Sequence, residues 1–157
     1  MGPKKILLVC LGNICRSPMA EGVLRAKALE RRLSITTDSA GTSSYHAGEA
    51  PDRRAQAAMR RHGIDISDLR ARPFVPEDFE RFDLLLAMDA DNLRDMRKQA
   101  PSAALAQKAQ LIMDHAPEVP ERAVPDPYYG DDRDFEHVFT LLDQACDNLL
   151  DGLNGHG

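Results

Sequence analysis

Cys10 and Arg16 are the residues of this chain whose types and spacing most clearly suggest chemistry. Five residues separate them, an apolar run at 6–9 precedes Cys10, and Ser17-Pro18 follows Arg16 as the start of a helix. A tight loop between a strand and a helix presents backbone N–H groups, and the helix N-terminus adds partial positive charge. Arg16 adds a fork of donors that suits a tetrahedral oxyanion, and the same field favours the thiolate form of Cys10. The pattern therefore predicts a nucleophile beneath a bound phosphoryl group.

The spacing of these two residues is by itself a weak signal, because three cysteines and many arginines produce such a pair by chance. A hydroxyl residue directly after the arginine, a strand before the motif and a helix after it make the signal specific. The alternative is a buried structural cysteine with a surface arginine nearby. Residues 11–16 lack the hydrophobic alternation of an ordinary core segment, so we favour the anion-binding loop.

The segment VCLGNICRSP at 9–18 resembles the signature of the low-molecular-weight protein tyrosine phosphatases. Four later segments resemble landmarks of this family in the family's order: DSAG at 38–41, HGI at 62–64, the stretch 83–89 ending in Met-Asp, and DPYYG at 126–130. The resemblance covers essentially the whole chain. It implies a phosphoric monoester hydrolase that acts on tyrosine-phosphorylated proteins and small aryl phosphates through a phosphocysteine intermediate, without a cofactor.

Three residues are expected to carry the catalysis. Cys10 would attack phosphorus in line, and Arg16 would hold two phosphoryl oxygens and stabilise the transition state. Asp126 is the candidate acid that protonates the leaving oxygen and later deprotonates a water. An Asp-Pro pair alone more often starts a turn. Its match to the family's Asp-Pro-Tyr-Tyr-Gly segment favours the catalytic role.

The loop and its supports form a second group of candidates. Gly12 would permit close backbone approach or a positive φ, and Ser17 could donate to the sulfur. The resemblance implies that Asn13, Ser17 and Ser39 form a hydrogen-bond network that fixes the loop. Asp89 would either cap a helix or brace the loop. The residues expected to surround the substrate phosphate are Leu11, Gly12, Asn13, Ile14, Cys15 and Ser17.

Tyr45, Tyr128 and Tyr129 are the only tyrosines, and all three fall in predicted loops that should border the pocket. Aromatic walls suit a phosphotyrosine ring. The resemblance implies that a tyrosine kinase could act on Tyr128 or Tyr129; simple wall packing is the alternative.

The other two cysteines receive different predictions. The resemblance implies that Cys15 traps an oxidised Cys10 as a reversible disulfide, which fits a thiol beside a reactive thiolate. Cys146 lies in an apolar helical run and is predicted to be core. One departure concerns the loop: Asp68-Leu69 stands where many relatives carry a histidine, so the support that this histidine gives must be absent or replaced.

Composition limits the class of protein. The chain of 157 residues fits a single domain over 1–157, and its formal charge of −5 argues against nucleic acid as a partner. No apolar stretch approaches the ~20 residues of a membrane span, and the run at 6–9 is too short for a signal peptide. Three cysteines suit a reducing compartment. A cytoplasmic enzyme is expected, with export by a route lacking a classical signal left open.

The elements that must position these residues alternate along the chain. Strands are predicted at 4–10, 35–39, 83–88 and 110–113, helices at 17–33, 52–62, 76–82, 90–99 and 135–150, and loops at 40–49 and 116–132. Ser17 would be the N-cap of the first helix, with Pro18 at its first position. The acidic residues Asp131, Asp132 and Asp134 would begin the last helix.

Alternating strands and helices predict an α/β fold: one three-layer domain with a small four-stranded parallel sheet, helices on both faces and a phosphate-binding loop after the first strand. Ligands bind beyond the carboxyl ends of such strands. Cys10, Ser39 and Asp89 should therefore gather at one edge.

Three other functions are alternatives for such a loop. Arsenate reductases share the loop but relay oxidation through a further cysteine pair, and no cysteine lies between Cys15 and Cys146. Phosphoarginine phosphatases typically carry Thr at the position of Ile14. The Ile14 of this chain favours phosphotyrosine as the substrate. A non-catalytic phosphate- or nucleotide-binding module would need neither Cys10 nor Asp126, and both glycine-rich nucleotide motifs are missing. No cluster of His or Cys suggests a metal, and phosphocysteine chemistry requires none.

Overall fold

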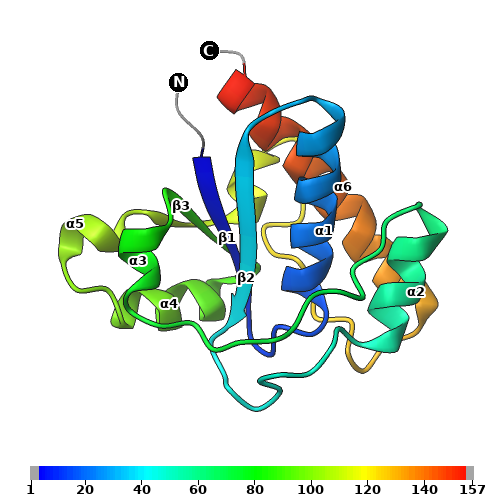
Figure 1. Ribbon diagram of the computed structural model, residues 1–157, viewed down its shortest axis with the longest axis horizontal. Coiled ribbons are helices and arrows are strands. Elements are labelled where there is room, and N and C mark those ends of the chain that lie inside the picture. Colours follow the sequence, from blue (N-terminus) through cyan, green and yellow to red (C-terminus); the bar gives the residue numbers. More distant parts are fainter. Residues whose placement is uncertain (1–3, 155–157) are drawn as a thin grey trace.

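A parallel four-stranded sheet forms the centre of the molecule (Figure 1). The structure is a computed structural model that describes residues 4–154. The strand order is β2-β1-β3-β4, with β1 at Lys4–Cys10, β2 at Ile35–Gly41, β3 at Leu84–Ala87 and β4 at Ala109–Leu111. The predicted α/β class and parallel sheet are confirmed.

Helices cover both faces of this sheet, as predicted. On one side lie α1 (Arg16–Glu30), α2 (Arg53–Arg61) and α6 (Asp132–Asn154); on the other lie α3 (Asp78–Arg81), α4 (Ala90–Lys98) and α5 (Ala103–Ala106). A short 3-10 helix, η1 (Ile112–His115), follows β4. No helix among the described residues is long and apolar enough to cross a membrane.

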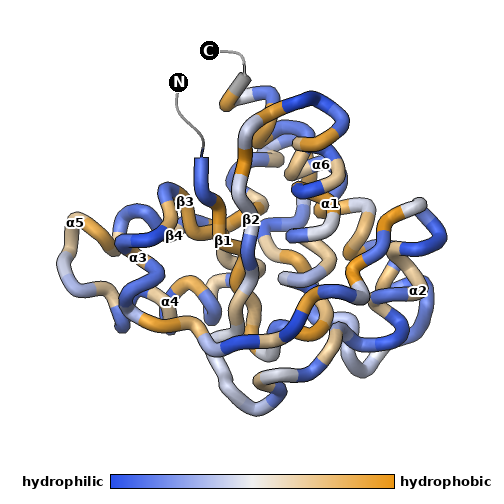
Figure 2. The backbone as a smooth tube through the Cα atoms, in the orientation of Figure 1, coloured by the Kyte–Doolittle hydropathy of each residue, from blue (hydrophilic) through white to orange (hydrophobic). Residues whose placement is uncertain are grey.

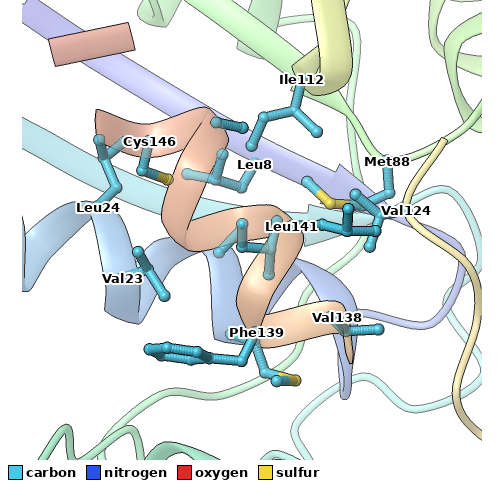
Figure 3. Close-up of a cluster of buried hydrophobic side chains, with 14 of the residues drawn as sticks. Leu8, Val23, Leu24, Met88, Ile112, Val124, Val138, Phe139, Leu141 and Cys146 are labelled. Carbon is cyan, nitrogen blue, oxygen red and sulfur yellow. The ribbon is translucent and has the colours of Figure 1, made fainter. Parts of the chain in front are cut away.

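The central strand β1 serves two hydrophobic clusters, because successive side chains of a strand point to opposite faces. Ile6 and Leu8 join the cluster under α1 and α6, while Leu7 and Val9 join the cluster under α3 and α4. Figure 2 shows hydrophobic residues concentrated along β1 and β3. Figure 3 shows the first cluster, with side chains of α6 lying over Leu8. Burial on both faces fixes the sheet beneath the loop that follows β1.

The start of α1 differs from the prediction. The helix begins at Arg16, and Cys15 occupies the N-cap position without a side-chain cap. The prediction that Ser17 is the N-cap is therefore wrong. The Ser17 hydroxyl instead makes contacts within the loop that precedes the helix.

The end of α1 comes three residues earlier than predicted, at Glu30. Arg32 has a φ of 58°, and its N–H donates to Leu29 O while the N–H of Leu33 donates to Ala28 O. This pair of bonds is a Schellman motif, which ends a helix without needing glycine.

Other boundaries also shift. Residues 112 and 113 belong to η1 rather than to the last strand, only Asp78–Arg81 of the predicted helix 76–82 is helical, and α5 was not predicted. The last helix begins at Asp132, before the predicted residue 135, because Asp131 and Asp134 form a capping box.

Candidate active site

The carboxyl ends of three strands meet at one edge of the sheet, as the topology predicts. In the parallel register Cys10 pairs with Gly41 and Leu8 with Ser39, so the ends of β1 and β2 are level. Asp89 follows β3, the other neighbour of β1. Cys10, Ser39 and Asp89 therefore come together beside the loop that joins β1 to α1.

The loop wraps around the sulfur of Cys10. The N–H of Asn13 lies 3.3 Å from Sγ and the hydroxyl of Ser17 lies 3.0 Å from it. The first turn of α1 follows directly, so its free N–H groups face the loop. Donors and a positive helix end around one sulfur make an anion-binding loop that suits a bound oxyanion.

Asn13 holds the loop in shape. Its φ is 58°, a left-handed conformation that Asn tolerates better than most residues. Its Nδ2 donates to Ser17 Oγ at 2.8 Å and to Ser39 Oγ at 3.0 Å, which is the network that the resemblance implied. Its Oδ1 accepts from the main-chain N–H of Arg72 at 2.9 Å.

Arg72 is a support that the sequence did not reveal. Asp68, which stands where many relatives carry a histidine, is on the surface and pairs with Arg25 rather than with the loop. The acceptor of Asn13 is instead satisfied by the main chain at position 72. The loop is therefore held at Asn13 by a main-chain N–H group, a contact that has no side-chain signature in the sequence.

Arg16 is almost completely buried, with 4% of its side chain exposed. Its Nη1 donates to Asp89 Oδ2 at 2.7 Å and to Val124 O at 3.0 Å, and its Nη2 lies 3.9 Å from Asp126 Oδ2. Burial alone would lower the pKa of Arg16, but Cys10 and Asp89 raise it, so the guanidinium stays charged. A fixed, charged fork lies next to the sulfur.

Asp89 performs both of the roles between which the sequence could not decide. Its Oδ1 accepts from the N–H of Asn92 and caps α4, while its Oδ2 holds Arg16. One carboxylate therefore ties the guanidinium to the start of a helix.

Asp126 approaches the site from the long loop before α6. Two bonds anchor this loop at Val124, whose N–H donates to Met88 O and whose carbonyl accepts from Arg16. Asp126 Oδ1 accepts from the N–H of Tyr128 at 3.1 Å, an Asx-turn, and 47% of the side chain is exposed. The carboxylate is thus reachable by water and faces the guanidinium.

A pocket of about 490 Å³ opens above the loop. Two of its lining residues, Ser43 and His46, were not among the predicted site residues. Both lie in the predicted loop 40–49 with Tyr45, and this position is the sequence feature that could have indicated them. The side chains of Asn13 and Ser17 lie behind the loop rather than in the pocket wall. Within the described part of the chain, no group of three His, Cys, Asp or Glu side chains could hold a metal ion. The lining residues are Cys10, Leu11, Gly12, Ile14, Cys15, Arg16, Ser43, Tyr45, His46, Asp126, Tyr128 and Tyr129.

Gly12 lies close to the ring of His46 and has no positive φ. A Cβ atom added to Gly12 would lie 3.2 Å from Cδ2 of His46, so the histidine side chain would have to move by a few tenths of an ångström. His46 also contacts Tyr45 edge-on at 4.8 Å between ring centroids and lies 3.1 Å from Glu49 through Nδ1.

All three cysteines are buried and free. Burial, then the charges of Asp52 and Cys10, strongly raise the pKa of Cys15, which is therefore a neutral thiol at physiological pH. Burial raises the pKa of Cys146 to about 12, and Figure 3 shows its side chain in the hydrophobic cluster, in agreement with the predicted core role.

Comparison with known proteins gives matches over nearly the whole chain. Residues 5–156 match the family model described as low molecular weight phosphotyrosine protein phosphatase. A Synechocystis protein named for this class of phosphatase is 50% identical over 95% of this chain and 96% of its own. The human low molecular weight phosphotyrosine protein phosphatase is 42% identical over 94% of both chains. The crystal structure of a protein tyrosine phosphatase from Entamoeba histolytica has a TM-score of 0.93 at 38% identity, covering 98% of both chains.

Proposed function

Because this chain belongs to the low molecular weight phosphotyrosine protein phosphatase family, and is a phosphoric monoester hydrolase, we propose that it hydrolyses phosphotyrosine and small aryl phosphates through a phosphocysteine intermediate at Cys10. One observation carries the proposal. The sulfur of Cys10 accepts from the N–H of Asn13 and lies 3.0 Å from the hydroxyl of Ser17, and Cys10 lines the same pocket as Arg16 and Asp126.

The proposed reaction has two steps. The sulfur attacks phosphorus in line, the P–S bond forms as the P–O bond breaks, and Asp126 protonates the leaving aryl oxide. A water then attacks the phosphocysteine, Asp126 accepts its proton, and the sulfur leaves as thiolate while Ser17 donates to it. Arg16 stabilises the equatorial oxygens in both steps. Proton transfer of this kind contributes roughly 10²–10⁴-fold.

The pocket wall supports an aromatic substrate. Ile14 and the rings of Tyr45 and Tyr128 border the space above the loop, and aromatic walls favour a flat apolar ring. The phosphoarginine and arsenate alternatives receive no support from the three relatives named above. The cysteine nearest in sequence that could continue an oxidative relay is Cys146, which lies in the hydrophobic core.

Two regulatory roles belong to the same proposal. Cys15 lies in the same loop as Cys10: once a peroxide has oxidised Cys10 to a sulfenic acid, the Cys15 sulfur would attack it, form the disulfide and release water. A tyrosine kinase would act on Tyr129 rather than on Tyr128. The Tyr129 side chain is 95% exposed, whereas the ring of Tyr128 is partly covered and lies 5.5 Å from Cζ of Arg54.

The deciding experiment is hydrolysis of an aryl phosphate in EDTA between about pH 5 and 8, a range in which a general acid of this kind should act. Wild type is compared with Cys10→Ser and with Cys146→Ala, a matched loss of a cysteine outside the pocket. We expect wild type and Cys146→Ala to turn over, Cys10→Ser to be inactive, and acid quenching to trap phosphate on Cys10. Full activity of Cys10→Ser, or faster release of phosphate from phosphoarginine than from phosphotyrosine peptides, would contradict the proposal.

A further inference from the structure

Asp78 is a completely buried carboxylate that lies outside the pocket. It is the first residue of α3, and both of its oxygens are used. Oδ2 accepts from Nη1 of Arg72 and from the N–H of Val75, each at 3.0 Å, and Oδ1 accepts from Nη2 of Arg72 at 3.1 Å. A buried carboxylate is costly unless it is paired, and a buried ion pair does not necessarily stabilise the fold. The role of Asp78 is therefore sought in the contacts of its partner, Arg72.

Arg72 is held on both its side chain and its main chain. Besides Asp78, a second acid, Asp38, accepts from its Nε at 3.1 Å. Its carbonyl accepts from the N–H of Gly41 at the end of β2, and its own N–H donates to Oδ1 of Asn13. The position of one main-chain N–H group is thus set by an ion pair on one side and by the sheet edge on the other.

Asn13 passes this constraint to the sulfur. Its left-handed backbone directs its N–H toward Cys10 at 3.3 Å, and its side chain is fixed by three hydrogen bonds, one of which comes from Arg72. A residue in such a conformation persists only where its surroundings determine it. Loss of the bond from position 72 would free the side-chain oxygen of Asn13 and loosen the loop around the sulfur.

We propose that Asp78 is a positioning residue of the phosphate loop, acting through its ion pair with Arg72 on the N–H that holds Asn13. The inference rests on the proposed function, because it assigns Asp78 to the chemistry of Cys10. The chain of contacts runs from Asp78 through Arg72 and Asn13 to Cys10.

The test measures the reactivity of Cys10 directly. The rate of Cys10 alkylation by iodoacetamide is followed against pH in wild type and Asp78→Asn, together with kcat/KM for an aryl phosphate. Asn keeps the size of Asp but loses the charge that fixes Arg72. We expect the alkylation profile to change, with slower labelling of Cys10 near neutral pH, since the donors that face the sulfur are less well placed. We expect kcat/KM to fall roughly tenfold, as for a small misplacement of reacting groups.

Two further variants make the result decisive. Asp68→Asn removes another Asp–Arg pair from the same segment without a contact to the loop, and should match wild type in its alkylation profile and in kcat/KM. Arg72→Gln keeps the N–H at position 72 but loses the pair with Asp78, and it decides the matter if Asp78→Asn does not fold. Thermal unfolding is measured for each.

The outcomes separate the two proposals. A lowered melting temperature of Asp78→Asn with an unchanged alkylation profile and unchanged kcat/KM would overturn the role of Asp78, as would equal losses in Asp68→Asn. If wild type itself hydrolyses no aryl phosphate, the proposed function fails first.

Discussion

The hydroxyl of Ser17 lies 3.0 Å from the sulfur of Cys10 and at the same time accepts a hydrogen bond from Nδ2 of Asn13 at 2.8 Å. Because Asn13 occupies a lone pair of the hydroxyl, its single hydrogen is free to point toward the sulfur. In the proposed mechanism Ser17 is therefore the residue that would stabilise a negative charge on Cys10, both before attack and when the sulfur leaves phosphorus.

Replacing Ser17 with Ala should slow the second step more than the first. The hydroxyl would no longer assist departure of the sulfur, so we expect about a tenfold loss of kcat, the size of one hydrogen bond to a charged group. Rapid-mixing kinetics should show a burst of aryl oxide followed by slower turnover. Ser34→Ala, a change at an exposed serine away from the loop, is the control. A variant that loses the burst itself would place the role of Ser17 in the first step instead.

Arg16→Lys should be severely impaired although the charge is kept. The guanidinium contacts Asp89 and Val124 at once, and a lysine cannot reproduce that fork while also gripping two phosphoryl oxygens. We expect roughly a 10²-fold loss of kcat/KM and weaker inhibition by inorganic phosphate. Arg25→Lys, at an exposed pair with Asp68, provides the comparison. Near-normal activity of Arg16→Lys would show that charge alone suffices at this position.

Asp126→Asn should hurt poor leaving groups more than good ones. The amide cannot supply a proton, so phenyl phosphate, whose leaving oxide needs one, should lose roughly 10²-fold or more. p-Nitrophenyl phosphate should lose less, because its oxide leaves more easily. The matched control is Asp91→Asn, which changes an exposed carboxylate of α4. Equal losses for both substrates would mean that Asp126 acts only after the aryl group has left.

The fold could be predicted because its signals are local and periodic. Apolar runs at 6–9 and 84–87 mark strands buried on both faces, and the helices between them require parallel connections. The same topology predicts that Cys10, Ser39 and Asp89 lie at one edge of the sheet. The residues of the loop follow each other in sequence, so their neighbourhood required no tertiary information.

What the sequence missed depends on tertiary contacts. Ser17 looks like an N-cap, but bonds to Cys10 and Asn13 outweigh local capping and the helix starts one residue earlier. The bond from Arg72 to Asn13 joins residues 59 positions apart through a main-chain atom, which carries no side-chain signature. Asp78 gives no signal either, since an Asp at the start of a helix is common on surfaces.

Iodoacetamide should label Cys10 well before Cys15 and Cys146 in the folded protein. Burial, then the negative charges of Asp52 and Cys10, raise the pKa of Cys15, and burial raises that of Cys146 to about 12, so neither forms the reactive thiolate near neutral pH. Mass spectrometry of labelled peptides over time measures the order. Labelling in urea is the control, because the three rates should converge once the chain unfolds. Equal labelling of Cys10 and Cys15 in the native state would contradict the prediction that the Cys15 thiol is neutral and unreactive in the folded protein.

Glu21 should make the stability of the protein depend on pH in an unusual direction. Only 5% of this residue of α1 is exposed. Burial raises the pKa of its carboxyl; a hydrogen bond with Ser39 opposes the rise and the charge of Asp38 adds to it, while Arg25 and Thr37 also face the group and lower it. The folded state therefore holds the Glu21 proton more tightly than the unfolded state, in which the pKa of a Glu side chain is about 4.3. The stability that this proton contributes is fully present below that value, and it is lost as the pH rises through the higher pKa of the folded state.

Glu21→Gln removes this titration, since an amide stays neutral. Urea unfolding at about pH 4.5 and about pH 7 should show that the variant gains stability relative to wild type at the higher pH, because wild type alone then carries a buried charge. Asp68→Asn serves as a control whose effect on stability should depend on pH in the opposite direction. Arg25 lowers the pKa of Asp68, so ionised Asp68 stabilises the fold above the pKa of the unfolded chain, and its loss should cost more at pH 7. A difference for Glu21→Gln that does not change with pH would show that Glu21 is ionised as easily in the folded protein as in the unfolded one, and a difference that follows Asp68→Asn would show that it is ionised more easily in the folded protein.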